Sequence, residues 1–338
     1  MREIMKTALC GDDVYGEDSS ISELESLMAK ITGKEDSLFV LTGTMGNLLS
    51  LMSLCDRGDE VICGDLSHLS KYEQGNISQF GGIPIRTLKN QSDGSISISD
   101  IMSNGYFQFN NPDFHCSMTK VICLENTHNM LGGIPLQIAY LDDIASFANE
   151  HGVLIHTDGA RLINAAIAQG LNYSFFNNLF SDIPINELCK HTDTVSICFT
   201  KGLGCPFGAI IAGSTKHIAK AKRLRKALGG QWRQGGIAAR CCSFSIKNLE
   251  PIRTDHENAK KWAESLKSLG FNVQTPASNI VLIDMKTPER AEDFISRLAE
   301  KGVFAQQAAQ AHFIRGVFHR SVDYEKLDDS IASFASLL

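Results

Sequence analysis

Several features that would place this 338-residue chain in a common functional class are missing from its sequence. Its 32 Lys and Arg residues are outnumbered by 38 Asp and Glu residues, and the net charge of -6 excludes the basic surface of a general nucleic-acid binder. No run approaches about 18 uninterrupted apolar residues, and the N-terminal MREIMKTALCGDD has no apolar leader segment, so we expect neither a membrane span nor secretion. The glycine motifs G-x-G-x-x-G and G-x-x-x-x-G-K-[ST] are also absent, which argues against a Rossmann dehydrogenase and a P-loop protein.

The ten cysteines include no C-x-x-C pair, and most lie in apolar runs such as VICG, VICLEN and SICFT. We therefore expect buried, reduced thiols in a cytoplasmic protein rather than a disulfide framework. His115 with Cys116, and His312 with His319, lack the spacing of metal ligands, so we expect no structural metal. The main basic run, residues 216–226, is expected on the solvated face of one helix.

Apolar strand-like segments alternate with amphipathic helix-like segments through the first two thirds of the chain. This alternation predicts an α/β domain with a mostly parallel sheet over residues 1–249. A long helical stretch is predicted from about residue 233 to 268. After it the pattern of strands and helices changes, and NIVLIDM and HFIRGVF are predicted as strands. We expect a small C-terminal α+β domain over residues 250–338.

Polar residues follow four of the predicted strands, where an open α/β sheet binds its ligands. They are Thr42-Gly43-Thr44, Glu125 to His128, Asp158 to Arg161, and Lys201. Lys201 ends the apolar run TVSICFT, so its amine would be desolvated and nucleophilic, as Schiff-base chemistry requires. The alternative is that Lys201 only ends a strand and extends to solvent.

Two further groups decide between these alternatives. Thr42-Gly43-Thr44 opens a helix, and free amides at a helix N-terminus can bind a phosphate, although ordinary N-capping explains the same residues. Asp158 would be a buried carboxylate, which needs a positive partner, either Arg161 or a cationic ring nitrogen. A phosphate site, a carboxylate and a buried lysine at three ends of one sheet together describe a pyridoxal phosphate (PLP) site.

Seven motifs follow one another from about Gly11 toward the C-terminus. They are GDDVYGED, TGTMGN, SH followed by a glutamate, LENTHN, HTDGAR, SICFTKGLGCPFGAIIAG and WRQGG. With them the chain resembles the low-specificity L-threonine aldolases of the β-eliminating lyase family. These are PLP-dependent enzymes of fold type I, with an aspartate aminotransferase-like large domain and a small C-terminal domain. The match of so many motifs is far more specific than any one of them.

The resemblance implies a set of cofactor contacts. Lys201 would hold PLP covalently, and Asp158 would bind the pyridine nitrogen and keep it protonated. The remaining contacts to phosphate and ring would come from Gly43, Thr44, His68, Arg161, Thr200 and Arg233. In the family, an arginine at the position of Arg233 typically comes from a neighbouring subunit.

The resemblance also implies the substrate contacts. His68 would stack on the cofactor ring and serve as, or assist, the base, and His128 would lie near the β-hydroxyl of the substrate. Arg161 and Arg315 would bind the substrate carboxylate, a bidentate task that suits arginine. Tyr15 would reach the site of a neighbouring subunit, which implies a homodimer or homotetramer. Without the resemblance, the pattern favours a structural role for each histidine and a strand-surface charge for Arg315.

The implied reaction is cleavage of L-threonine or L-allo-threonine to glycine and acetaldehyde, a lyase step of amino-acid metabolism that serves threonine catabolism and glycine formation. Two rivals stay open: another PLP reaction such as β-elimination on the same scaffold, or a catalytically impaired, oligomer-forming relative. A Rossmann dehydrogenase is disfavoured because its glycine fingerprint is absent.

Three departures from the family pattern bear on these alternatives. The segment R-S-D-T-V-T that usually precedes GDD is not matched, which would remove a serine that helps to bind the substrate carboxylate. Gln231 and Trp232 replace smaller residues of G-G-G-M-R-Q, and Cys205 stands where alanine or threonine is common. The stretch from Asn172 to Glu187 is longer than usual. We expect these changes to affect substrate range and oligomer geometry more than cofactor binding.

Overall fold

The computed structural model describes residues 1–103, 114–170, 185–308 and 310–338. Its larger sheet has the strand order β1-β7-β6-β5-β4-β2-β3, in which the neighbours from β6 through β5, β4 and β2 to β3 are parallel and β7 is antiparallel to β1 and β6. The strands are β1 (Asp36–Val40), β2 (Glu60–Gly64), β3 (Ile85–Leu88), β4 (Thr119–Glu125), β5 (Leu154–Asp158), β6 (Thr194–Cys198) and β7 (Ala209–Gly213).

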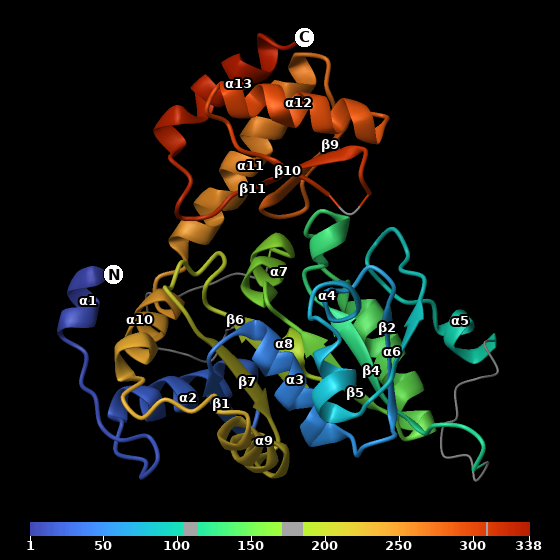
Figure 1. Cartoon of the computed structure of the whole chain (residues 1–338), viewed down its shortest axis with the longest axis vertical. Coiled ribbons are helices and arrows are strands. Elements are labelled where there is room, and N and C mark those ends of the chain that lie inside the picture. Colours follow the sequence, from blue (N-terminus) through green and yellow to red (C-terminus); the bar gives the residue numbers. More distant parts are fainter. Residues whose placement is uncertain (104–113, 171–184, 309) are drawn as a thin grey trace.

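Helices cover both faces of this sheet and make a three-layer domain (Figure 1). On one face lie α2 (Ser19–Thr32), α6 (Ile138–His151), α7 (Leu162–Ala168), α8 (Ile185–Cys189) and α10 (Gly236–Ile246). On the other lie α3 (Gly43–Leu54), α9 (Thr215–Ala227) and the π-helix η1 (Ile77–Gly81). Strand β4 shows why both faces are needed: Ile122 and Leu124 pack on one side and Val121 and Cys123 on the other.

The smaller sheet, at the top of Figure 1, has the order β10-β11-β9-β8 and is antiparallel throughout. It is made by β8 (Asn272–Val273), β9 (Ile280–Asp284), β10 (Gln306–Gln307) and β11 (Phe313–Val317). Helices α11 (Glu250–Ser268) and α12 (Pro288–Glu300) pack on it, and α13 (Leu327–Ala335) packs against α11. Trp262, Phe271, Phe294 and Phe334 form edge-to-face and tilted contacts in its own hydrophobic core. The division of the chain at residue 250 stays a prediction.

Shorter elements link these parts. They are α1 (Arg2–Lys6), α4 (His68–Lys71), α5 (Ile98–Ser103), and the 3-10 helices η2 (Asn129–Leu131) and η4 (Tyr324–Lys326). The predicted mostly parallel α/β fold with a small α+β part is confirmed.

Two local expectations are wrong. The helical stretch over 233–268 is interrupted, because α10 ends at Ile246 and α11 begins at Glu250. Pro251 lies in the first turn of α11, where its missing N–H costs nothing, whereas in the middle of one long helix it would break a hydrogen bond. The basic run on α9 is also not entirely solvated, since Arg225 is buried and donates to the Asp13 carboxylate at 2.8 Å.

The helix that follows β1 is held close to the sheet. Thr42 caps α3 by accepting a hydrogen bond from the Met45 N–H at 3.1 Å. A side chain at Gly46 would meet Ile211 at 3.1 Å and Ser196 at 3.4 Å, so glycine permits the close approach of α3 to β6 and β7. This contact brings the N-terminus of α3 to the carboxyl ends of the central strands.

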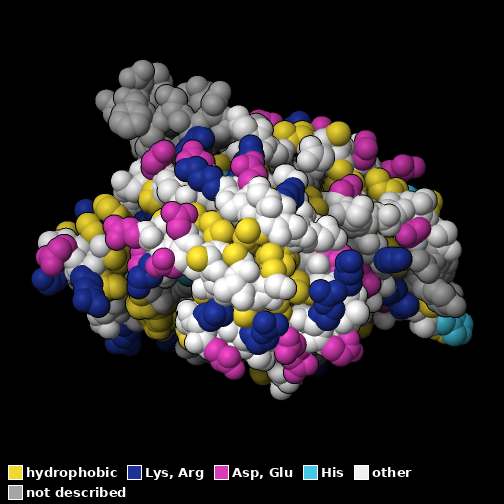
Figure 2. Space-filling view, turned by 90° about the horizontal axis from the view of Figure 1, so that it is seen from above, with side chains coloured by type: hydrophobic (Ala, Val, Ile, Leu, Met, Phe, Trp, Pro, Cys, Tyr) yellow, Lys and Arg dark blue, Asp and Glu magenta, His cyan; other side chains and the backbone are white. Residues whose placement is uncertain are grey.

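The surface and the thiols agree with the sequence-based expectations. All ten cysteines are free, and only Cys10 and Cys116 are exposed. On the face that Figure 2 shows, acidic and basic side chains are interspersed, without a large area of one sign. In the described part of the chain, none of the helices combines the length and the apolar character that crossing a membrane requires.

We predict that Phe334→Ala lowers the free energy of unfolding by about 3–5 kcal/mol, since it removes a fully buried ring from the core of the small sheet. Phe304→Ala is the matched control, because that ring is 86% exposed and its loss should change stability by less than about 0.5 kcal/mol. Equilibrium urea unfolding measures both. Equal destabilisation by the two changes would contradict the described core.

Candidate active site

The carboxyl ends of β2, β4, β5 and β6 meet between the two sheets, and there the predicted catalytic residues gather. Lys201 follows β6 by three residues in a turn closed by a hydrogen bond from the Gly204 N–H to the Lys201 carbonyl at 2.9 Å. Lys201, Thr200, Arg161 and Arg320 line one cavity of about 260 Å³. Among the residues that the structure describes, none forms a hydrogen bond or ion pair with Lys201 Nζ, so the amine is available to a ligand.

Asp158 ends β5 and is 3% exposed. Its Oδ2 accepts a hydrogen bond from Asn47 Nδ2 at 2.9 Å and its Oδ1 from the Ala160 N–H at 3.0 Å. Both donors are neutral, and within the described ranges no cation pairs with this carboxylate; Arg161 contacts Asn129 instead. The sequence-based alternative of an Asp158–Arg161 salt bridge is therefore wrong. A buried carboxylate that lacks a cationic partner fits the protonated ring nitrogen of a bound pyridine.

The N-terminus of α3 offers a site for an anion on the same edge of the sheet. Gly43 and Thr44 are the first residues of this 12-residue helix, so their N–H groups have no partner within it. Since a phosphate binds well to such amides, these two residues fit the role that the resemblance implies.

His68 begins α4, directly after β2. Its Nδ1 lies 2.9 Å from Glu73 Oε1, and the Glu73 side chain is fully buried. The hydrogen bond to Glu73 raises the pKa of His68, while burial and the charge of nearby Lys201 oppose that shift. The His68 backbone N–H donates to Glu125 Oε2 at 2.7 Å, and the Asn129 N–H donates to Glu125 Oε1 at 2.8 Å. Glu125 thus ties together the loops that carry both histidines.

His128 is 1% exposed, and its two ring nitrogens have no hydrogen-bond partner in the described structure. Burial lowers the pKa of His128, so the ring is neutral near pH 7. Its Cβ lies next to Gly94, which has a positive φ of 86°. A neutral, unpartnered imidazole can accept a proton from a ligand hydroxyl.

Arg161 and Arg315 converge on a single neutral acceptor. Arg161 Nη1 and Arg315 Nη2 donate to Asn129 Oδ1 at 2.9 and 2.5 Å, although Arg315 comes from β11 of the small sheet. The Nε groups of both arginines are buried and have no hydrogen-bond partner within the described part of the chain. Burial lowers the pKa of both guanidinium groups, and the charge of Arg161 also helps to lower that of Arg315 to about 10. The pair fits a small carboxylate, which would supply the missing negative charge.

Tyr15 and Arg233 are not brought into this cluster. Tyr15 is 72% exposed, and the Arg233 side chain, which is 59% exposed, lies 3.4 Å from Asp12. Both positions face solvent. Thr200 Oγ1 lies 3.1 Å from the Cys198 sulfur and contributes to the wall of the Lys201 cavity.

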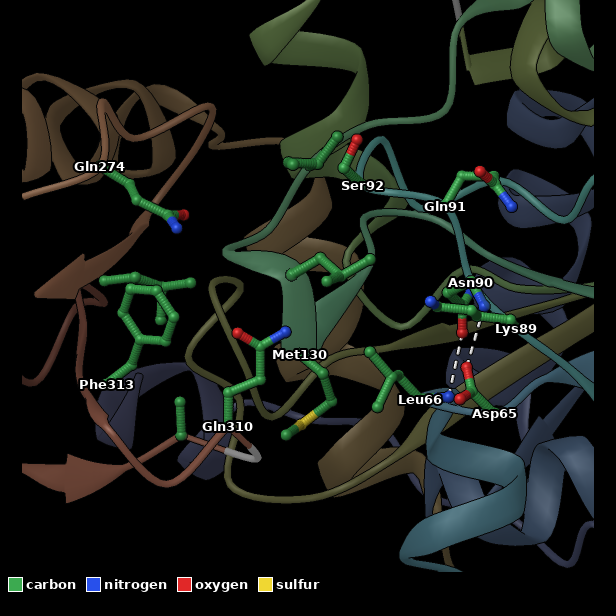
Figure 3. A pocket seen from close by; sticks show the side chains of 14 residues that line it. Asp65, Leu66, Lys89, Asn90, Gln91, Ser92, Met130, Gln274, Gln310 and Phe313 are labelled. Carbon is green, nitrogen blue, oxygen red and sulfur yellow. Dashed lines mark hydrogen bonds between the residues drawn. The ribbon is translucent and has the colours of Figure 1, made fainter. Parts of the chain in front are cut away.

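A second cavity, of about 500 Å³, lies beyond β2, β3 and β4 and reaches the small sheet. Figure 3 shows Leu66, Met130 and Phe313 facing it from different segments, together with the polar side chains of Gln274 and Gln310. Leu66 is two residues before His68, and Met130 follows Asn129, so this cavity flanks the histidine side of the candidate site.

The ligand atoms of His68, Glu73 and Asp158 lie within 4.8 Å of one another, close enough to hold a metal ion. However, one amide, that of Asn47, already donates to both carboxylates, and the adjoining N-terminus of α3 favours an anion. The donor set therefore fits an organic phosphate cofactor with a cationic ring better than it fits a metal.

Sequence reasoning missed three residues that build the site, Asn47, Glu73 and Asn129, and it named Glu125 at a strand end without giving it a role. Each is part of a motif that was recognised, but its role depends on a partner far along the chain. The signal that was available is the type of residue, since an amide or a carboxylate next to an apolar run needs a partner when buried.

The departures from the family pattern have local explanations. Trp232 packs edge-on against Phe207 and Phe39, with ring centroids 4.7 and 6.2 Å apart, and Gln231 Nε2 donates to Asp13 Oδ2 at 3.0 Å. Cys205 lines the Lys201 cavity. The longer stretch from 172 to 187 falls outside the described residues, except for its last three.

The chain is similar over its whole length to proteins of one family. A family model described as Beta-eliminating lyase matches residues 1–288. The low-specificity L-threonine aldolase 1 of Arabidopsis thaliana is 39% identical over 341 residues, which cover 99% of this chain and 91% of that protein. The corresponding Escherichia coli K12 protein is 32% identical over 339 residues, 100% of this chain and 95% of its own. A solved threonine aldolase from Leishmania major has the same fold, with a TM-score of 0.78, 23% identity, and coverage of 100% and 96% of the two chains.

We predict that Glu73→Gln lowers the pKa of His68, because the carboxylate that stabilises the imidazolium is replaced by a neutral amide. The protonated form of His68 should then be lost at a lower pH than in the unaltered protein. NMR titration of the imidazole protons measures the shift. Glu264→Gln, on the exposed side of α11, is the control, and an unchanged His68 titration in Glu73→Gln would contradict the pairing.

Proposed function

The chain belongs to the beta-eliminating lyase family, and from that premise we propose that it cleaves β-hydroxy-α-amino acids, L-threonine and L-allo-threonine among them, to glycine and an aldehyde. It is a PLP-dependent lyase. The relatives that bear the name L-threonine aldolase match nearly the whole chain and nearly the whole of their own length. Their names support the substrate class that we propose.

One observation from the structure itself supports PLP as the cofactor. The buried Asp158 carboxylate has only neutral hydrogen-bond donors and lies on the same sheet edge as the unpartnered amine of Lys201 and the free amides at Gly43 and Thr44. A ring nitrogen, an aldehyde and a phosphate are the three groups that these residues suit, and PLP carries all three. When bound, PLP supplies an electron sink for the electron pair released at the α-carbon.

The residues of the chain have distinct tasks in this proposal. Lys201 would hold the aldehyde end of the cofactor through its amine. Asp158 would hold the protonated ring nitrogen through a charged hydrogen bond. Thr200, in the wall beside Lys201, and His68 would complete the binding site.

Proton transfer falls to the histidines. His128 has a lowered pKa and, among the residues that the structure describes, no partner at its ring nitrogens, so it accepts the proton of the substrate's β-hydroxyl while the Cα–Cβ bond breaks. His68 holds a proton more firmly because of Glu73, which suits a residue that orients water or returns a proton rather than one that removes it. The different surroundings of the two rings thus separate their roles.

Substrate binding falls to Arg161 and Arg315. Their two guanidinium groups share only the neutral oxygen of Asn129, and a substrate carboxylate would pair with both. Because Arg315 lies on the small sheet and Arg161 follows β5, the carboxylate would bridge the two parts of the molecule. This bridging positions Cα and Cβ between Lys201 and the histidines.

We further propose that the protein acts as a homo-oligomer in the cytoplasm. Tyr15 and Arg233 are exposed on one copy, as expected of side chains that complete a site in another copy, and Leu9, Ile237 and Phe244 are exposed apolar residues on neighbouring elements. Ten free thiols, eight of them buried, suit a reducing compartment.

The function is tested by aldehyde release from L-threonine and L-allo-threonine by the PLP-loaded protein, with its visible spectrum recorded. We expect both activity and a visible cofactor band, and both should vanish in Lys201→Ala while Lys301→Ala, an exposed lysine, keeps them. 2-Oxobutyrate and ammonia in place of glycine and aldehyde would identify β-elimination instead. Cofactor binding without any turnover would indicate an impaired relative.

The oligomer is tested by sedimentation equilibrium. We expect a mass of at least two chains, and we expect Arg233→Gln to weaken cofactor binding although this side chain is exposed in one copy. A monomer with full activity would contradict the proposal.

A further inference from the structure

Asn47 lies one turn into α3, is 2% exposed, and uses its whole side-chain amide in hydrogen bonds. Its Nδ2 donates to Glu73 Oε1 at 2.8 Å and to Asp158 Oδ2 at 2.9 Å. Its Oδ1 accepts from Ser196 Oγ at 2.6 Å and lies 3.1 Å from His156 Nε2. The one side chain therefore joins residues from β5, β6 and the loop after β2.

The direction of the hydrogen bonds that Asn47 forms follows from the chemistry of its partners. Ionised carboxylates only accept, so both N–H bonds of Asn47 must point to Glu73 and Asp158, and the amide oxygen must point to Ser196 and His156. His156 Nε2 consequently carries a proton toward Asn47, and its Nδ1 lies 2.9 Å from the Thr194 hydroxyl and 3.1 Å from the Thr194 carbonyl oxygen. Burial lowers the pKa of His156 to about 4, which keeps this ring neutral at physiological pH.

Both carboxylates depend on the amide of Asn47. Asp158 and Glu73 are buried and repel each other, and the pKa of Glu73 is raised mainly by its burial. Asn47 is the only described side chain that hydrogen-bonds to both. Without its two N–H groups, Asp158 would keep only the Ala160 N–H, and Glu73 would keep His68 and a weak contact from Asn76 at 3.5 Å.

We propose that Asn47 is a positioning residue of the active site, which aims Asp158 at the cofactor ring nitrogen and holds Glu73 behind His68. The proposal rests on the function proposed above. Asn47 reaches neither substrate nor cofactor: it acts through the two carboxylates. Because it lies on the same helix as Gly43 and Thr44, it also fixes the distance between the phosphate end and the ring-nitrogen end of the site.

Asn47→Asp tests the inference, since it keeps the shape of the side chain and removes both N–H donors. Asn47→Leu is a second variant that adds no charge. Ser50→Ala is the matched control on the same helix, because the Ser50 hydroxyl is buried and has no hydrogen-bond partner in the described structure. In each PLP-loaded variant we would measure cofactor affinity, kcat, KM, and the ¹⁵N chemical shift of the labelled pyridine nitrogen.

We expect both Asn47 variants to lower kcat and cofactor affinity by about 10- to 100-fold, as follows from losing a hydrogen bond to a buried charge. KM should change far less, since Arg161 and Arg315 are untouched. The ¹⁵N signal should move toward that of an unprotonated pyridine, a change that a mere packing role would not produce. Ser50→Ala should leave all four quantities unchanged.

A folded Asn47 variant that keeps the ¹⁵N shift and a kcat within about twofold of the unaltered enzyme would overturn the inference. If neither variant folds, the side-chain amide signals of Asn47 in the unaltered protein decide. They should shift when PLP binds, because Asp158 then pairs with the ring nitrogen, and unchanged signals at saturation would refute the proposal. An unaltered protein that binds no PLP would refute the proposed function, and this inference with it.

Discussion

The candidate site depends on one costly arrangement, the burial of the Asp158 carboxylate without a cation beside it. Removing a carboxylate from water is unfavourable unless hydrogen bonds and an opposite charge compensate. The fold supplies the hydrogen bonds, from Asn47 and the Ala160 backbone, but leaves the charge to a ligand. The same condition applies to Arg161 and Arg315, which share one neutral acceptor. Asp158 thus fits a cationic ring, and the pair of Arg161 and Arg315 fits an anion.

The parallel sheet is what allows these groups to meet. The neighbouring strands β2, β4, β5 and β6 run in the same direction, so the loops that carry His68, His128, Asp158 and Lys201 emerge at a single edge. Buried polar contacts then hold the loops to one another: Glu125 accepts from the backbone at His68 and Asn129. The small sheet adds Arg315 from the other side. The site therefore takes its residues from both sheets.

The surroundings of the two histidines explain how residues of one type come to differ in chemistry. His68 is partly exposed and paired with a buried carboxylate, whereas His128 is buried and unpaired. Their pKa values move in opposite directions for these reasons. Residues of one type therefore differ in how readily they hold a proton, and a sequence motif does not express that difference.

The sequence by itself determined the class of fold and the strand-end residues, because apolar periodicity and the order of motifs are local properties of the chain. It also pointed to the cofactor, since the types of residue at three strand ends match three chemical groups. Only the tertiary structure decided that Arg161 turns to Asn129 rather than to Asp158, that Pro251 separates α10 from α11, and that Arg225 is buried against Asp13. It alone revealed Asn47 between two carboxylates that lie 26 and 111 residues away. The physical reason is that a buried polar group takes whichever partner the packing brings within about 3 Å, and sequence separation carries no information about that distance.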